Sequence, residues 1–210
     1  MKIAILGTTG LTGYALYKEA LKRGHEVTAL IRDEKKAKQI LGDDTKYKIV
    51  DALNLKDNDL DGFDVFINAY ANHEDSSQYM KVAKRIVEIV TDKPIRYVQL
   101  LGASSLKTQD GKLLIEHIME RGDATGSEPW YANEVFKFLK SLPNNVNWTG
   151  VSPQQMLYPG MPTDFKISSD SLIYNILGHS QVSNGTYAVA ILDEIENPNF
   201  INSRFAVGEV

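Results

Sequence analysis

The sequence has no cysteine among its 210 residues, which excludes disulfide bonds, thiolate nucleophiles and cysteine–zinc sites. It has no apolar run near the ~20 residues that a membrane-spanning helix needs. The apolar run at residues 3–6 is too short for the core of a signal peptide. An excess of positive charge is also absent, since 23 basic residues face 27 acidic ones. General nucleic-acid binding is therefore disfavoured. We expect a cytoplasmic protein with neither a nucleic-acid nor a membrane partner.

The composition that is present is that of an ordinary globular protein, with 43% hydrophobic and 24% charged residues. A chain of this length buries roughly 70% of its unfolded surface, which is enough for a core that needs no disulfide or metal. The length predicts a single domain over residues 1–210, because no repeat or linker divides the chain. We expect a monomer or a homodimer.

Short apolar runs alternate with helical segments along most of the chain. Strands are expected near residues 3–6, 26–31, 47–50, 64–70, 95–101, 148–152 and 204–208. Helices are expected near residues 12–23, 35–41, 78–90, 130–142 and 186–196. This alternation predicts a parallel sheet covered by helices on both faces. Right-handed crossovers then favour a doubly wound α/β fold.

Residues 153–183 differ from the rest of the chain. They are rich in Pro, Gly, Ser and Asp, and their apolar residues show weak periodicity. We expect them to form a small C-terminal lobe at the sheet edge, on the substrate side, rather than a second domain.

Three glycines follow the first expected strand and open the first expected helix, in the run Gly7-Thr8-Thr9-Gly10-Leu11-Thr12-Gly13. A glycine-rich turn in this position is typical of dinucleotide binding. Gly7 would permit the tight turn, Gly10 would let the backbone approach a pyrophosphate, and Gly13 would let the helix pack closely on the strand. The phosphates would lie at the positive end of that helix. The run therefore predicts an NAD(P)-binding Rossmann fold.

The end of the second expected strand bears on the choice between NADPH and NADH. NAD-binding proteins place an acid about 20 residues beyond the glycines, where it accepts hydrogen bonds from the ribose. Here Arg32 follows the strand, with Lys35 and Lys36 close behind. A guanidinium suits a 2′-phosphate through two parallel hydrogen bonds, so NADPH is favoured as the cofactor. Asp33 leaves NADH possible, because its carboxylate could serve a ribose.

The glycine spacing G-x-x-G-x-x-G resembles that of the short-chain dehydrogenase/reductase superfamily, in its extended and atypical branches. Further segments narrow the resemblance: W-T-G-V-S-P at 148–153, Y-P-G at 158–160, D-E-I-E-N-P at 193–198 and R-F-A-V-G at 204–208. They resemble the NAD(P)H-binding, NmrA-like proteins commonly described as NADH-flavin reductases, with biliverdin/flavin reductases as more distant relatives. The resemblance spans nearly the whole chain but is not specific for one activity. Thr8 departs from it, since alanine is common at that position.

The resemblance implies further cofactor contacts at the carboxyl ends of strands. Asp51 would bind the adenine amino group, with a simple loop carboxylate or helix cap as an equal alternative. The backbone of Ala69 and Tyr70 would line the adenine-side ribose.

On the nicotinamide side, the resemblance places Gly102 and Ser104 after the fifth expected strand and Pro153 after the sixth. Ser104 or Ser105 could hydrogen-bond a nicotinamide amide or a flavin carbonyl, and Ser104 is the candidate catalytic residue. The acceptor pocket would be walled by Gln154, Met156 and Tyr158.

A catalytic pair typical of the superfamily is missing. Its members use a tyrosine with a lysine four residues later, because the lysine lowers the pKa of the phenol and so lets it exchange a proton with a substrate hydroxyl. Only Tyr14 has such a lysine, Lys18, and both fall on the first expected helix. Tyr131, on the helix where the pair belongs, is followed by Val135. Alcohol–ketone chemistry through that pair is therefore disfavoured.

Two function classes remain. The first is an NAD(P)H-dependent oxidoreductase that passes hydride to a small-molecule acceptor, a flavin or a quinone-like ring, which needs no positioned protein acid. The second is a non-catalytic, NAD(P)-sensing regulator of the NmrA-like type. A sugar-nucleotide epimerase or dehydratase is disfavoured by the missing pair and by the short chain. No metal site is expected, because the four histidines show no ligand spacing.

Overall fold

A computed structural model describes residues 1–210. The elements follow one another in the order β1 (Lys2–Leu6), α1 (Leu11–Lys22), β2 (Glu26–Ile31), α2 (Glu34–Leu41), β3 (Tyr47–Ile49), the short 3-10 helix η1 (Ala52–Asn54), β4 (Val65–Asn68), α3 (Gln78–Val90), β5 (Arg96–Leu100), α4 (Leu114–Glu120), α5 (Glu128–Lys140), β6 (Trp148–Ser152), β7 (Met156–Tyr158), β8 (Phe165–Ser168), β9 (Gln181–Ser183), α6 (Asn184–Glu196) and β10 (Ser203–Glu209). Every strand and helix expected from the sequence is present, with ends within two residues of the expected ones.

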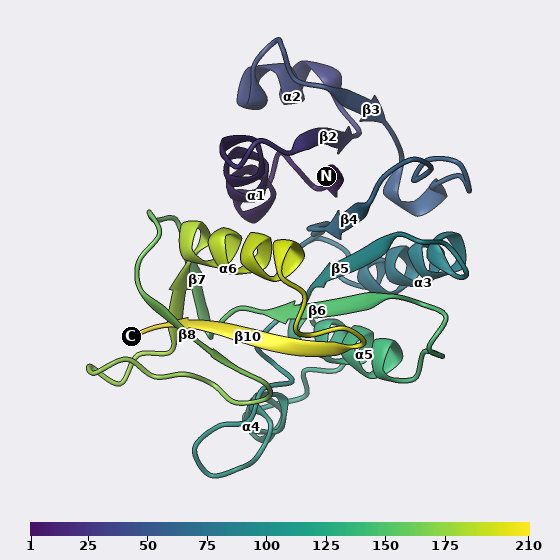
Figure 1. The fold of residues 1–210 in the computed structure, drawn as a ribbon. Helices are drawn as coiled ribbons and strands as arrows, with labels where there is room; N and C mark the ends of the chain where they lie inside the picture. The colour runs from purple at the N-terminus through teal and green to yellow at the C-terminus, as the bar shows by residue number, and fades with distance from the viewer.

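Eight strands form one sheet in the order β3-β2-β1-β4-β5-β6-β10-β8 (Figure 1). All neighbouring strands run parallel except β8, which runs antiparallel to β10 at the edge. The chain moves outward from β1 to β3 and then returns to β4 on the other side of β1. The sheet is therefore doubly wound, as the sequence predicts. In such sheets ligands bind beyond the carboxyl ends of the strands, near the point where the strand order reverses.

Helices cover both faces of the sheet, because side chains of successive strand residues point to opposite faces. Ile3 and Ile5 of β1 belong to the core cluster that includes Leu16 of α1 and Ile191 of α6. Ala4 and Leu6 of the same strand belong to the other large cluster, which holds residues of α3 and α5. This two-sided burial explains why the central strands read as continuous apolar runs.

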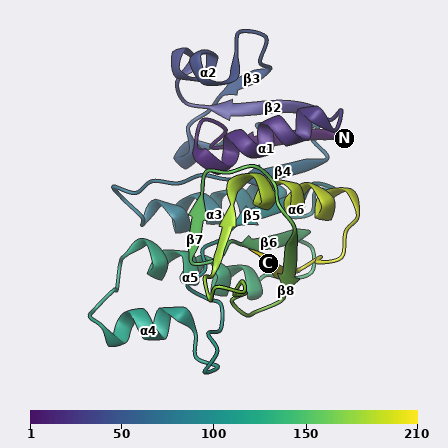
Figure 2. The same ribbon diagram turned by 90° about the vertical axis from the view of Figure 1, so that its left-hand side faces the viewer.

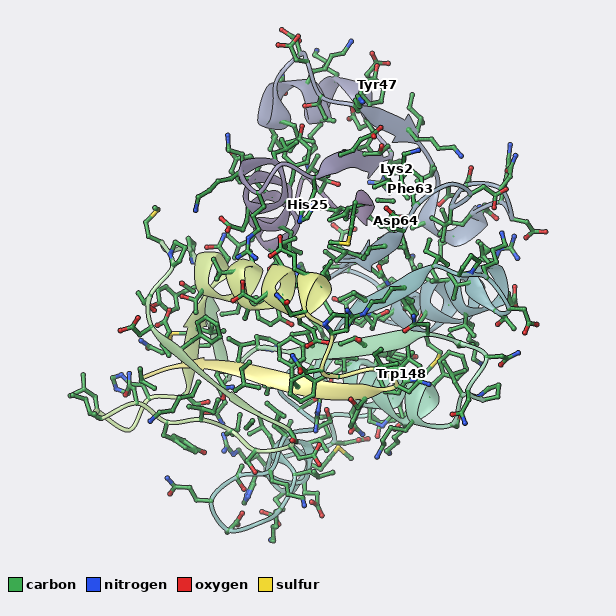
Figure 3. All side chains as sticks on the ribbon, viewed as in Figure 1. Lys2, His25, Tyr47, Phe63, Asp64 and Trp148 are labelled. Atoms are coloured by element: carbon green, nitrogen blue, oxygen red, sulfur yellow. The ribbon has the colours of Figure 1, made fainter.

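Three contacts join elements at the amino ends of the strands. The Lys2 N–H donates to the Asp64 carboxylate at 2.7 Å. Arg23, just after α1, pairs with Glu196 of α6 at 2.8 Å, and the His25 ring lies 2.9 Å from the same carboxylate. Figure 3 shows Lys2 and Asp64 close together, with His25 beside α1 on the side toward α6. The carboxylates of Asp64 and Glu196 thus each have a hydrogen-bonding partner at this edge.

The segment expected as a lobe carries three short strands that the sequence does not predict. β7 and β9 form a separate two-stranded parallel sheet. β8 joins the main sheet at its edge. In Figure 1, β10 runs toward the chain end at the left, and β7 and the adjoining loops lie there too. Figure 2 looks onto this side and shows β7 in front of the central sheet. Helix α4, between β5 and α5, is also unpredicted.

The longest helices have 13 residues, and none combines the length and the apolar surface needed to span a bilayer.

Candidate functional site

The glycine loop is held by close backbone contacts that exclude larger residues. Gly7 has a φ of +84°, and a Cβ there would lie 2.4 Å from the carbonyl oxygen of Ala69. A Cβ on Gly13 would lie 2.1 Å from the carbonyl oxygen of Gly7. The Gly10 N–H donates to that same carbonyl at 3.0 Å. Helix α1, the loop and the end of β4 therefore approach one another closely through backbone atoms.

Helix α1 begins without a side-chain cap. Its N-cap is Gly10, and its first turn contains no acidic residue. Helices α2, α5 and α6 each start with a capping side chain, from Asp33, Ser127 and Ser183 respectively. Helix α3, like α1, has no side-chain cap. The first N–H groups of a helix have no partner within it, and its N-terminus carries partial positive charge. The start of α1 thus offers free donors for an anion.

The side chains of the glycine loop differ in burial, with Thr8 buried and its neighbours nearer the surface. Thr8 is fully buried, and its hydroxyl donates to the Ile5 carbonyl at 2.6 Å. This bond gives the threonine at position 8 a local structural role. Thr9 and Thr12 are half-buried, and Leu11 is exposed. The buried residue fixes the loop, while its neighbours lie at the surface.

At the end of β2, Arg32 and Asp33 have different roles. The Asp33 carboxylate caps α2 by accepting the Lys36 N–H at 3.0 Å. Arg32 is exposed and takes part in no ion pair or side-chain hydrogen bond. The acid that left NADH open is thus engaged by the backbone, and the guanidinium beside it is free.

Asp51 also acts as a cap. Its carboxylate accepts the Leu53 N–H at 3.0 Å at the start of η1 and also accepts from the Asn54 amide.

At the end of β4, the Tyr70 N–H donates to the Asn68 side-chain oxygen at 3.1 Å. The Tyr70 side chain is half-buried, and its hydroxyl donates to the Gln78 side-chain oxygen. The contact between Ala69 and Gly7 places the end of β4 against the glycine loop.

The two serines after β5 differ in their surroundings. Ser105 Oγ accepts from the Arg204 guanidinium at 2.7 Å. Arg204 itself is buried, stacks over the Phe136 ring at 4.1 Å and pairs with Asp170. Burial lowers the pKa of Arg204, although the Asp170 contact opposes this. Ser105 is therefore a structural partner of a buried cation.

Ser104 Oγ, by contrast, is buried and has no hydrogen-bond partner. Buried hydroxyl groups are nearly always paired, because leaving one unpaired costs about 1–3 kcal/mol. Gly102, two residues earlier, faces α5 so closely that a Cβ there would lie 3.1 Å from the Cβ of Ala132. Ser104 is thus a buried donor available to a ligand group at the carboxyl end of β5.

The predicted substrate wall is only partly at the surface. Pro153 is buried, and so is Gln154, whose amide donates to the Val207 carbonyl at 3.0 Å. The Gln154 oxygen accepts from Ile173 N–H and Ser180 Oγ. Its side chain therefore has protein partners on both its amide nitrogen and its amide oxygen.

Met156 and Tyr158 lie further out. Met156 is 58% exposed, and Tyr158 is half-buried with its hydroxyl donating to Glu209 at 2.5 Å. This hydrogen bond raises the pKa of Tyr158. Burial works to raise the pKa of Glu209, but hydrogen bonds from Tyr158 and Ser183 outweigh it and hold that pKa below its ordinary value of 4.5. Glu209 thus joins β7, β9 and the end of β10.

No tyrosine–lysine pair occupies α5. Tyr131 is half-buried and packs edge-on against Trp130, with ring centroids 4.8 Å apart. Val135 is buried in the core. Tyr14 is 38% exposed on α1. The position four residues after Tyr131 therefore supports packing and no proton transfer.

Two hollows lie away from the glycine loop. One, of about 470 Å³, is formed between α4 and α5 by residues that include Met119, Trp130 and Glu134. The other, of about 410 Å³, lies near the amino end of β2 and includes Tyr17 and His25. No group of three or more His, Asp or Glu residues is placed to hold a metal ion.

The strand order, the turn after β1 and the free donors at the start of α1 define a dinucleotide-binding protein of the Rossmann type. Comparison with known proteins agrees. The NAD(P)H-binding family model matches residues 7–198, and the chain belongs to that family.

Several proteins resemble the whole chain. The uncharacterized protein YwnB of Bacillus subtilis is 32% identical over 99% of this chain and 98% of its own length. A crystal structure of a Lactobacillus casei protein has a TM-score of 0.90 at 32% identity, and each chain is fully covered. One from Streptococcus pneumoniae, named a "putative NADH-flavin reductase", has a TM-score of 0.87 at 28% identity, also with full coverage of both chains.

Proposed function

We propose that this protein is an NAD(P)H-dependent reductase that transfers hydride from the nicotinamide to a flavin or a quinone-like acceptor, with NADPH as its preferred cofactor. Membership of the NAD(P)H-binding family supports a nicotinamide nucleotide as the cofactor. The name of the Streptococcus pneumoniae neighbour supports a flavin as the acceptor.

The residues present fit such a nucleotide. The uncapped start of α1, with residues 9–13, would hold the pyrophosphate. Arg32 would bind the 2′-phosphate, since its guanidinium has no partner in the protein. Ala69 and Tyr70 would lie beside the ribose, with Asp51 near the adenine. Gly102, Ser104 and Pro153 would border the nicotinamide. When bound, the nucleotide supplies the hydride, and these residues orient it.

The observation that carries the proposal is a contrast on either side of the expected nicotinamide position. Ser104 offers a buried, unpartnered hydroxyl, whereas α5 offers Val135 in place of the lysine. A donor that can orient an amide or a ring carbonyl is thus present, and a proton-transfer pair is absent. Flavins and quinones accept hydride without a positioned protein acid, so proximity and orientation suffice.

The same contrast allows one alternative, a regulator that binds NAD(P) and performs no chemistry. The missing pair and a Ser104 hydroxyl that binds the nicotinamide amide suit both functions. The name of the Streptococcus pneumoniae neighbour favours the reductase. An epimerase or dehydratase of sugar nucleotides would need the missing pair.

Steady-state oxidation of NADPH with FMN, riboflavin or menadione as the acceptor tests the proposal. We expect turnover with at least one of them. Micromolar binding of NADPH without turnover on any acceptor would refute the reductase and favour the regulator.

The preference for NADPH is tested with Arg32→Ala. Loss of charged hydrogen bonds to a phosphate costs about 1.5–3 kcal/mol, so we expect the Kd of NADPH to rise roughly ten- to hundredfold. The Kd of NADH should stay unchanged. Arg121→Ala, at the exposed end of α4, is the control. An Arg32→Ala protein that keeps its preference would show that Arg32 does not bind the 2′-phosphate.

A further inference from the structure

The loop between β8 and β9 ends in a rigid turn at Asn175–His179. The Gly178 N–H donates to the Asn175 carbonyl at 2.9 Å, and the Asn175 N–H donates to the His179 carbonyl at 2.9 Å. The Asn175 side-chain oxygen also accepts the N–H groups of Leu177 and His179, each at 3.0 Å. Four hydrogen bonds thus fix five residues, and Gly178 takes the positive φ of +78° that the turn requires.

The tip of this turn presents two aliphatic side chains to solvent. Ile176 is 97% exposed and Leu177 is 73% exposed. Single exposed aliphatic residues are ordinary. The four hydrogen bonds hold the backbone of the turn, so these two side chains project from a defined position.

The base of the turn is anchored beside the expected nicotinamide position. The Gln154 side-chain oxygen accepts from Ile173 N–H at 2.8 Å and from Ser180 Oγ at 2.9 Å, which lie on the two sides of the loop. Gln154 directly follows Pro153 at the carboxyl end of β6. The Met156 N–H donates to the Ser180 carbonyl at 3.0 Å. The tip thus extends from a base that is joined to the carboxyl ends of β6 and β10.

The lobe also meets the segment that follows β5. The Lys107 N–H donates to the Asp170 carbonyl at 2.7 Å, and the Leu172 N–H donates to the Lys107 carbonyl at 2.8 Å. Ser104, with its free hydroxyl, lies three residues before Lys107. An acceptor above Ser104 would have the lobe along one side.

We propose that Ile176 and Leu177, together with the exposed Met156, form an apolar rim that contacts the planar ring of the hydride acceptor. This inference rests on the proposed reductase function. Hydride transfer requires the nicotinamide to face the acceptor ring at close range, which leaves the rest of the ring to be covered. Ligand sites achieve this mainly with apolar side chains. A rigid turn holds such side chains in place at little entropic cost on binding.

The double substitution Ile176→Ser and Leu177→Ser tests the rim. We expect the KM for FMN and for menadione to rise about tenfold, since two aliphatic contacts are lost. The Kd of NADPH and the urea midpoint of unfolding should not change, because both side chains are exposed. Ile201→Ser is the matched control, because Ile201 is 52% exposed and lies at the amino end of β10. It should alter none of these quantities.

The variants Asn175→Ala and Asn175→Asp test whether the rigid turn matters. Alanine removes the acceptor of two N–H groups and should raise the KM for the acceptor, whereas aspartate keeps that acceptor and should preserve the KM. Equal KM values in the wild type, the double variant and both Asn175 variants would overturn the proposal. A double variant that changes oligomeric state at constant KM would also overturn it, by assigning the tip to contacts between copies.

Failure of the proposed function gives a different result. In that case the wild type oxidises NADPH with none of the tested acceptors. Direct titration of the NADPH-bound protein with FMN, followed by flavin fluorescence, then tests the rim alone. Weaker FMN binding in the double variant supports the rim. Equal FMN binding by the wild type and the double variant refutes it.

Discussion

Replacing Gly10 or Gly13 by alanine should separate the loop residues that maintain the fold from those that leave room for the nucleotide. A Cβ on Gly13 would lie 2.1 Å from the Gly7 carbonyl oxygen, 2.7 Å from its carbon and 2.9 Å from the Thr8 Cα. All three atoms belong to the backbone, so no side chain can move aside. Helix α1 would have to shift away from the loop. We expect Gly13→Ala to reduce the free energy of unfolding by about 3 kcal/mol, at the upper end of overpacking costs.

Gly10 has different surroundings. Its φ of −86° is open to alanine, and a Cβ there would meet only the Gly7 carbonyl oxygen at 3.3 Å. The residue is exposed at the N-cap of α1. We expect Gly10→Ala to cost about 1 kcal/mol or less in unfolding free energy, as for other poor N-caps. The added methyl would occupy the space through which a phosphate approaches the helix.

The two assays are urea unfolding and titration with NADPH, followed by nucleotide fluorescence. We expect Gly10→Ala to keep a urea midpoint close to that of the wild type and to weaken NADPH binding at least ~tenfold, or about 1.4 kcal/mol. Gly13→Ala should lose stability first. Tight NADPH binding by a folded Gly10→Ala protein would show that the pyrophosphate does not approach this part of the loop. A Gly13→Ala protein as stable as the wild type would refute the packing argument.

Three further predictions concern buried polar groups. Glu194 and Arg96 form an ion pair in which both side chains are less than 10% exposed. Glu194→Ala should therefore reduce the free energy of unfolding by about 3–5 kcal/mol, measured by urea unfolding. Glu88→Ala is the control, because Glu88 is exposed. The pKa of Glu209 is lower in the folded protein than its ordinary 4.5, so its stabilising contribution is complete above pH 4.5 and is lost as the pH falls through the folded-state pKa. The wild type should therefore lose stability over this acidic range more steeply than Glu209→Gln, as measured by urea midpoints at successive pH values. Ser104→Ala removes a buried hydroxyl that has no partner. The free energy of unfolding of the nucleotide-free protein should stay the same or rise by about 1 kcal/mol, while turnover with FMN should fall. A decrease in unfolding free energy of about 1 kcal/mol would instead indicate a structural role for Ser104.

The sheet and its main helices were predictable because their signals are local. Ile3, Ala4, Ile5 and Leu6 are apolar in succession because β1 is buried on both faces, and this leaves a continuous run in the sequence. The short strands β7, β8 and β9 leave no such run. They have three or four residues each, and several of these are exposed. Their pairing depends on partners elsewhere in the chain, which periodicity does not report.

The glycine loop between β1 and α1 was predictable from the sequence, but the hydrogen-bonding state of the side chains around it was not. The glycine run marked the loop, because Gly7 and Gly13 are required by contacts within it. The sequence could not distinguish Ser104 from Ser105, since the difference lies in Arg204, which is 99 positions away. Gln154 was expected at the acceptor wall, and its actual partners, Val207, Ile173 and Ser180, are all distant in the sequence. No local signal would have found them.

Three of the polar groups that the fold leaves unpaired lie in a row across the sheet. Arg32 at the end of β2, the N–H groups at the start of α1 after β1, and Ser104 after β5 are free, whereas Asp33 and Ser105 beside them are engaged. The order β2-β1-β4-β5 separates the first from the last by three strand spacings, or about 14 Å at ~4.8 Å per spacing. Only an extended ligand can reach both. A dinucleotide with a phosphate at its adenosine end meets this requirement, because it presents anions to Arg32 and α1 and an amide to Ser104. A mononucleotide would leave one end of the row unpaired, so truncating the ligand should weaken binding more than any single substitution along the row.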